Sequence, residues 1–144
     1  MKMKPLDILI AEDDKGHATA ITRNLEKAYP DASISVVTSI RAYQEYIAST
    51  TPSIVIMDLN LSDGSAMNLL TAPAIEAAFP TIMMTSFGSE QVAVDAIKRG
   101  ALDYMVKSSD SFALIGTTVA GVLREWHLLR DKKSMELQLK DSQA

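Results

Sequence analysis

The sequence lacks several features that would point to particular classes of protein. It has no cysteine, which excludes disulfides and thiolate metal ligands and is consistent with a reducing compartment such as the cytoplasm. Its net charge is −4, and no basic cluster of the kind that binds nucleic acid is present. No apolar run is long enough to span a membrane, and the N-terminus does not have the pattern of a signal peptide. We therefore expect a cytoplasmic chain that binds neither nucleic acid nor membrane.

What is present fits a single globular domain. The chain has 144 residues, of which 47% are hydrophobic and 22% are charged. This length is enough to bury a sizeable core. We expect one domain over residues 1–130, followed by a helical connector or tail over residues 131–144.

The stretch from Ile54 to Asn60 carries the clearest strand pattern in the sequence. Four apolar residues lead directly into Asp58, and a polar stretch containing Gly64 follows. A short apolar run flanked by turn residues is typical of a strand buried on both faces of a parallel sheet. Asp58 then lies at the carboxyl end of that strand, where open α/β sheets place their chemistry.

The rest of the chain alternates between the periods of strands and helices. Strands are expected over residues 8–11, 33–38, 54–57, 81–84 and 102–106. Helices are expected over residues 16–29, 40–48, 66–78 and 90–99, with a long last helix from about residue 111. Pro73 lies inside the third of these helices and should kink or restart it. Five strands alternating with five helices predict an α/β fold, a parallel sheet with helices on both faces.

Polar groups follow four of the predicted strands. Glu12, Asp13 and Asp14 follow the first, Asp58 the third, Thr85 the fourth and Lys107 the fifth. Because the carboxyl ends of parallel strands share one edge, these groups should converge. Crowded carboxylates repel one another, and Mg²⁺, which prefers oxygen ligands, relieves this repulsion. A carboxylate in such a site can act as a nucleophile towards phosphorus, while a lysine and a hydroxyl bind phosphoryl oxygens.

At these residues the chain resembles the receiver domain of two-component response regulators, over residues from about 4 to 130. The resemblance lies in ILIAEDD at the first strand, IVIMDLN at the third, MMTS at the fourth and DYMVK at the fifth, in that order. It implies a flavodoxin-like, doubly wound, five-stranded parallel sheet with five helices, the last of them extended.

The resemblance also implies roles for residues. Asp58 would be the phosphoacceptor. Mg²⁺ would be held by Glu12, Asp13 and Asp58 and by the backbone carbonyl of Asn60. Thr85 and Lys107 would bind the phosphoryl group, and Thr85 and Tyr104 would form the switch.

The function implied is that of a phosphorelay domain rather than an enzyme. Asp58 would accept a phosphoryl group from a histidine kinase or a histidine phosphotransfer protein, with Mg²⁺-dependent self-phosphorylation from small donors and slow autodephosphorylation. Phosphorylation would change a surface that an output domain or effector protein binds.

The sequence departs from the family in its loops. Receivers usually carry proline after the last-strand lysine, where this chain has Ser108, and often carry proline at Ser62 and glycine at Ala66. The lysine–proline bond is commonly cis in the family, but a cis bond before a residue other than proline costs about 2.5–4 kcal/mol. We therefore expect a trans Lys107–Ser108 bond and a rearranged loop over residues 108–111.

Two other functions share some of these features. A phosphatase of the haloacid dehalogenase type also ends a strand with a nucleophilic aspartate, but it would need a second acid where this chain has Asn60. A degenerate receiver that only binds partners would not need the complete set of acidic, hydroxyl and lysine groups. Asp14 is interpreted as a helix-start residue, and His17 and His127 as surface residues.

The last helix has two apolar stripes. One runs from Phe112 to Leu129 and should face the sheet, and a neighbouring one continues through Leu128, Met135 and Leu139. A helix with such a seam resembles the connectors that pair as coiled coils, so we expect packing on a second copy of the chain, a possible homodimer. The alternative is a solvated tail.

Overall fold

The computed structural model describes residues 5–142, so the first four and last two residues of the predicted ranges lie outside it. Five parallel strands form one sheet in the order β2-β1-β3-β6-β7. The strands are β1 (Asp7–Ala11), β2 (Ser33–Val37), β3 (Ile54–Asp58), β6 (Thr81–Thr85) and β7 (Asp103–Val106). From β1 the chain moves to β2 on one side of the sheet, and from β3 it moves to β6 and β7 on the other side. Doubly wound sheets bind their ligands at this change of direction, between β1 and β3.

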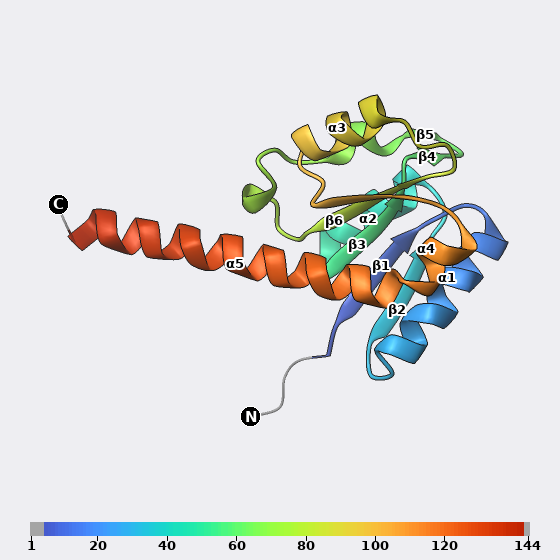
Figure 1. Cartoon of the computed structure of the whole chain (residues 1–144), viewed down its shortest axis with the longest axis horizontal. Helices are drawn as coiled ribbons and strands as arrows, with labels where there is room; N and C mark the ends of the chain where they lie inside the picture. The colour runs from blue at the N-terminus through green and yellow to red at the C-terminus, as the bar shows by residue number, and fades with distance from the viewer. Residues whose placement is uncertain (1–4, 143–144) are drawn as a thin grey trace.

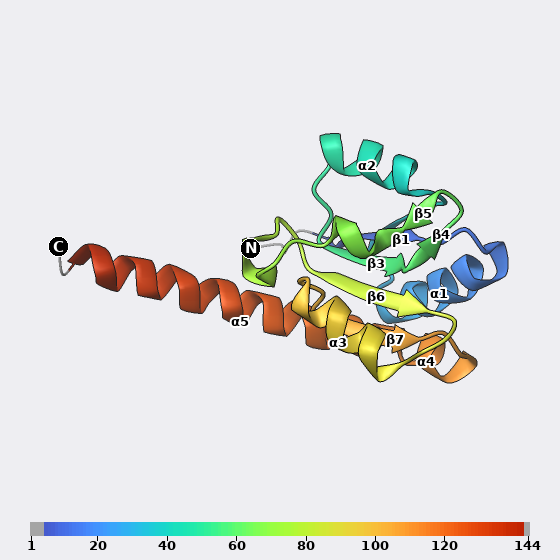
Figure 2. The same ribbon diagram turned by 90° about the horizontal axis from the view of Figure 1, so that it is seen from above.

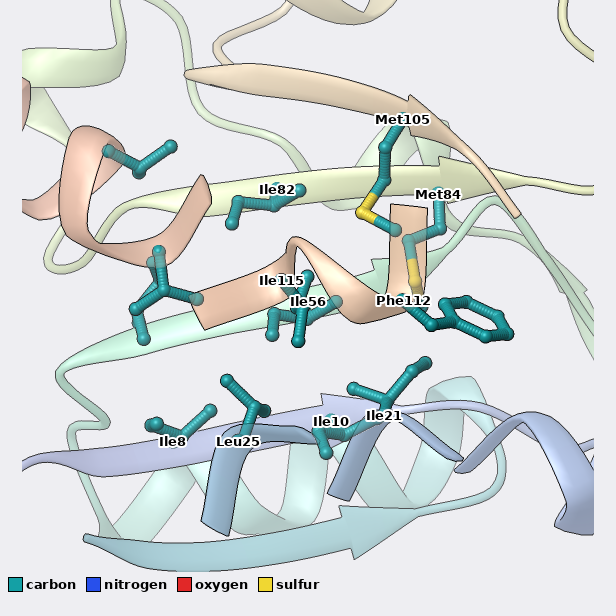
Figure 3. Close-up of a cluster of buried hydrophobic side chains, with 13 residues drawn as sticks. Ile8, Ile10, Ile21, Leu25, Ile56, Ile82, Met84, Met105, Phe112 and Ile115 are labelled. Atoms are coloured by element: carbon teal, nitrogen blue, oxygen red, sulfur yellow. The ribbon is translucent and has the colours of Figure 1, made fainter. Parts of the chain in front are cut away.

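Helices cover both faces of the sheet, as predicted (Figure 1). The α-helices are α1 (Lys15–Ala28), α2 (Ile40–Ser49), α3 (Glu90–Lys98), α4 (Ser109–Ala113) and α5 (Ile115–Ser142). One face packs against α1, α4 and α5, and Figure 3 shows its core, including Ile10, Ile56 and Met84 from the strands and Ile115 from α5. The other face packs against α2 and α3 through residues such as Leu9, Met57 and Tyr43. Alternate residues of each strand thus enter alternate cores.

The helix predicted over residues 66–78 is wrong. The chain instead forms a short hairpin, β4 (Asn60–Leu61) with β5 (Gly64–Ser65), and two 3₁₀ turns, η1 (Ala66–Leu69) and η2 (Ala74–Glu76). Pro73 has no N–H to donate, and a residue before proline avoids the helical region. Pro73 itself is extended, with ψ of 155°, and so are Leu70 and Ala77, which end η1 and η2, with ψ of 147° and 152°. The apolar side chains Leu69 and Leu70 still pack on the core. Their apolar pattern therefore resembles that of a helix that buries one face.

The last helix also differs from the prediction, because it is interrupted at Leu114. Ser108 and Ser111 form a reciprocal capping box that begins α4, and the break follows one turn later. From Ile115 the predicted stripe is confirmed: Ile115, Val119, Val122 and Trp126 are buried.

The second half of α5 projects away from the sheet (Figures 1 and 2). At the point of departure, Arg130 Nη1 donates to the carbonyl of Ile75 in η2 at 3.0 Å, and its guanidinium lies 4.9 Å from the Trp126 ring. Lys133 and Glu76 form an ion pair at 3.9 Å. The predicted helical conformation beyond residue 130 is confirmed for residues 131–142. Within residues 5–142, no helix is both long and apolar enough to cross a membrane.

Candidate functional site

The carboxyl ends of the strands bring the predicted polar groups to one edge of the sheet. Asp58 is the last residue of β3 and pairs with Met84, one residue before Thr85 at the end of β6. Glu12 and Asp13 directly follow β1, and Lys107 directly follows β7. The sheet register therefore explains why residues far apart in sequence face a single pocket.

Lys107 lies at the centre of this pocket. Its Nζ is 2.7 Å from Asp58 Oδ2 and 2.5 Å from Glu12 Oε1. The side chains of Lys107, Glu12 and Asp58 are 5%, 0% and 7% exposed. One ammonium thus compensates two buried carboxylates, and little water is available to screen any of the three charges.

This crowding shifts the pKa values of two groups. Burial raises the pKa of the Glu12 carboxyl above 4.5, partly opposed by the bond from Lys107 and reinforced by Asp58. Burial acts to lower the pKa of Lys107, but its bonds to Asp58 and Glu12 outweigh this effect and raise it above 10.5. The pocket therefore favours a retained positive charge on Lys107 and resists negative charge on Glu12.

Three carboxylates at the pocket could hold a metal ion together. Glu12, Asp13 and Asp58 each offer an oxygen, and these oxygens lie within 4.8 Å of one another. Asp13 is exposed, whereas the other two are buried. A cavity of about 440 Å³ is lined by Asp13, Asp58, Asn60, Thr85 and Lys107, among others. An all-oxygen donor set beside an open, polar cavity fits Mg²⁺, which keeps several of its waters when bound to proteins.

The second oxygen of Asp58 is held by the backbone that follows it. The N–H of Asn60 donates to Asp58 Oδ1 at 3.2 Å, and Asn60 begins the β4–β5 hairpin. The two carboxylate oxygens of Asp58 therefore have different partners, a backbone N–H and the Lys107 ammonium. Asn60 itself is exposed and lines the cavity.

The two predicted switch residues lie on neighbouring strands. Thr85 is buried, and its Oγ1 donates to the carbonyl of Phe87 at 3.2 Å. Tyr104 is half-buried, and within residues 5–142 its buried hydroxyl oxygen has no hydrogen-bond partner. A buried hydroxyl without a partner is costly, so this position of the tyrosine ring is a poorly satisfied one.

The sequence reasoning missed His17, which the structure places at the edge of the pocket rather than on the open surface. Its Nδ1 lies 3.4 Å from Lys107 Nζ and 3.6 Å from Glu12 Oε1. The centroid of its ring lies 5.8 Å from that of the Phe112 ring. The signal was its place on the first helical turn after the acidic residues. Asp14 does begin that helix, since it accepts the His17 N–H at 2.9 Å, and this bond chiefly lowers its pKa.

The loop after Lys107 follows the prediction. Among the residues described, Ala72–Pro73 is the only cis peptide bond, so Lys107–Ser108 is trans. Ser108 instead caps α4: its Oγ accepts the Ser111 N–H at 3.0 Å, and Ser111 Oγ accepts the Ser108 N–H at 2.9 Å. A serine cap thus takes the place of the family's proline.

Comparison with known proteins decides the family. The sequence model of the response regulator receiver domain matches residues 8–118. The chain belongs to this family. Receiver domains are phosphoacceptor signalling domains that generally bind Mg²⁺ in an acidic pocket. The predicted family and fold class are confirmed.

The chain is also similar in sequence to individual regulatory proteins. The chain is 34% identical over 128 residues to the methanogenesis regulatory protein FilR1 of Methanothrix harundinacea, covering 86% of this chain and 29% of that protein. It is 32% identical over 124 residues to the transcriptional regulatory protein ZraR of Escherichia coli K12, covering 85% and 27%. The chain therefore spans less than a third of the length of these relatives.

A solved structure gives the same result. The receiver domain of a putative LuxO repressor protein from Vibrio parahaemolyticus superposes with a TM-score of 0.72 at 25% identity, covering 87% of this chain and 95% of that one.

Proposed function

We propose that Asp58 of this receiver domain accepts a phosphoryl group from the histidine of a partner kinase or histidine phosphotransfer protein. An oxygen of Asp58 attacks phosphorus, an O–P bond forms, and the N–P bond of the phosphohistidine breaks as the imidazole leaves. The observation that carries the proposal is the buried contact of Lys107 with Asp58 and Glu12. This contact supports the proposal because it holds one cation beside the Asp58 oxygen that would attack phosphorus, where it could bind a phosphoryl oxygen.

Glu12, Asp13, Asp58 and the backbone carbonyl of Asn60 would hold Mg²⁺. When bound, the ion supplies positive charge to the phosphoryl oxygens and relieves the repulsion between the carboxylates. Lys107 and the Thr85 hydroxyl would bind the remaining phosphoryl oxygens. The same site supports self-phosphorylation from small donors and slow autodephosphorylation. Asn60 stands where a haloacid dehalogenase phosphatase needs its second acid, so turnover of phosphate esters is not expected.

Removing one carboxylate charge from the metal site should weaken Mg²⁺ binding. We expect Glu12→Gln and Asp13→Asn each to raise the dissociation constant about fivefold or more, because each lost charge removes about 1 kcal/mol of attraction. Asp13→Asn should also raise the free energy of unfolding by relieving repulsion. Amide NMR titration with Mg²⁺ measures the affinity. Asp14→Asn, which removes a nearby exposed charge, is the matched control, and unchanged titrations of both site variants would contradict this placement of the metal.

Phosphorylation should reach Tyr104 through Thr85. Drawing the Thr85 hydroxyl towards a phosphoryl group breaks its bond to Phe87 and opens space into which Tyr104 can turn. Since the tyrosine hydroxyl is buried without a partner, a new position that satisfies it is favourable. Beryllofluoride, which mimics the phosphoryl group, should shift amide signals around Tyr104 and along α3, β7 and α5. Shifts restricted to the acidic pocket would argue against this switch.

The projecting part of α5 is proposed to be a connector to an output domain or effector. The partial coverage of FilR1 and ZraR supports this proposal, because each of those relatives is more than three times as long as its matched part. On α5, Leu128 and Met135 are 63% and 70% exposed and Leu139 is 62% exposed. Pairing with a second copy through these three side chains stays a prediction. The domain boundary at residue 130 and a cytoplasmic location also stay predictions.

A further inference from the structure

Asp63 connects the hairpin after the phosphoacceptor strand to a helix elsewhere in the fold. Its Oδ1 accepts the backbone N–H of Ile40 at 2.8 Å, and its Oδ2 accepts that of Arg41 at 3.1 Å. Ile40 and Arg41 are the first two residues of α2, and the side chain of Ser39, the helix's own cap, accepts the N–H of Ala42. Two of the free N–H groups at the start of α2 are therefore satisfied by a carboxylate from another segment.

The hairpin that carries Asp63 is too small to hold its own shape. It pairs Asn60 with Ser65 and Leu61 with Gly64, and Ser62 and Asp63 form its two-residue turn. Gly64 has a φ of 145°, which a residue with a side chain rarely adopts. Isolated two-stranded hairpins are marginally stable in water, so contacts outside the hairpin must fix it.

Those outside contacts lie at its base, on its side and at its tip. At the base, Leu59 N–H donates to the carbonyl of Met84 in β6 at 2.7 Å. On the side, Leu61 is buried in the core. At the tip, within the residues that the structure describes, Asp63 supplies the two bonds to α2. These two bonds chiefly lower the pKa of the Asp63 carboxyl, so it remains charged at neutral pH.

We propose that Asp63 is a positioning residue for the metal site, acting through the backbone of Asn60. By holding the hairpin tip on α2, it keeps Asn60 beside Asp58, where the Asn60 N–H binds Asp58 Oδ1. The proposed metal ligand is the carbonyl of the same residue. This inference rests on the proposed function and extends it to a residue that contacts neither Mg²⁺ nor the phosphoryl group.

The test compares two ways of weakening the same helix start. In the full chain, Asp63→Ala removes the bonds between hairpin and helix, and Ser39→Ala removes the helix's own cap but leaves the hairpin attached. Both should lower the melting temperature. Only Asp63→Ala should raise the Mg²⁺ dissociation constant, by about fivefold, and shift the Asn60 amide signal. Asp63→Asn keeps one oxygen acceptor and should have an intermediate affinity, which also covers the case in which Asp63→Ala does not fold.

The outcomes separate the inference from the proposed function. Wild-type Mg²⁺ affinity in the Asp63 variants, with weakened binding in Asp13→Asn, overturns the inference and leaves the proposed function standing. An equal loss of affinity in Ser39→Ala also overturns it, because the effect would then come from the stability of α2. A wild-type chain that does not bind Mg²⁺ overturns both.

Discussion

Incubation with Mg²⁺ and acetyl phosphate should add one phosphoryl group to the chain, and Asp58→Asn should abolish this addition. An amide is a far weaker nucleophile than a carboxylate, and Asp58 is the acid that Lys107 and the Asn60 N–H hold at the end of β3. Intact-mass spectrometry measures the added group directly. Removing the metal with a chelator should prevent labelling of the wild-type chain as well.

The control for this prediction is an exposed aspartate away from the pocket. Asp31→Asn removes the same charge at an exposed position and should label like the wild type. Full labelling of Asp58→Asn would show that another residue is the acceptor. Labelling that survives chelation in the wild type would instead contradict the role of Mg²⁺.

Replacing Lys107 with methionine should be the most destabilising change within the pocket. Methionine has a similar length but leaves Glu12 and Asp58 buried without their cation. Breaking a buried ion pair from one side costs about 3–5 kcal/mol, so we expect a decrease of about 3 kcal/mol in the free energy of unfolding without metal. Urea denaturation measures this change. Mg²⁺ should restore part of the loss, because it replaces the missing positive charge.

The loss of stability in Lys107→Met should depend on pH. The pKa of Glu12 is already raised in the folded wild type, so its charge opposes folding once the pH rises above about 4.5. In Lys107→Met this carboxyl loses its cation, and the loss of stability should be smallest in acid and grow towards neutral pH. In the wild type, the contribution of Lys107 should be complete below pH 10.5 and disappear above it, as the pH passes its raised folded pKa.

Two variants check that the lost charge in the pocket is responsible. Lys133→Met removes an exposed lysine whose partner Glu76 is also exposed, and such pairs contribute about 0–1 kcal/mol. Lys107→Met combined with Glu12→Gln removes one of the two stranded carboxylates and should recover stability relative to Lys107→Met alone. A Lys107→Met chain as stable as Lys133→Met at neutral pH would contradict the electrostatic account.

The sequence predicts the sheet and the pocket well because both depend on simple periodic signals. Each buried strand is a short apolar run, and the parallel arrangement then forces Glu12, Asp58, Thr85 and Lys107 to one edge. The trans bond at Ser108 also follows from local chemistry alone, since only proline makes the cis form accessible at low cost.

The remaining features depend on contacts that no local pattern carries. The segment over residues 66–78 has helical spacing, but Pro73 interrupts it, and the chain is extended at Leu70, Pro73 and Ala77. His17 reaches the pocket because it lies in the first turn of α1, on the side of the helix that faces Lys107. In the sequence Asp63 resembles any turn residue, and only the fold shows that its carboxylate binds the start of α2. Side chains that bridge distant elements are thus the part that sequence reasoning could not supply.

The last helix, α5, extends well beyond the domain (Figure 1). Its 28 residues correspond to a rod of about 42 Å at 1.5 Å per residue, and the part beyond Arg130 measures about 18 Å. Arg130 and Lys133 attach this rod to η2, in the segment that connects β3 to β6. Because a rigid rod multiplies a rotation by its length, a tilt of about 10° at Arg130 would displace the far end by about 3 Å. A partner joined at that end would therefore receive a movement larger than any at the fulcrum itself.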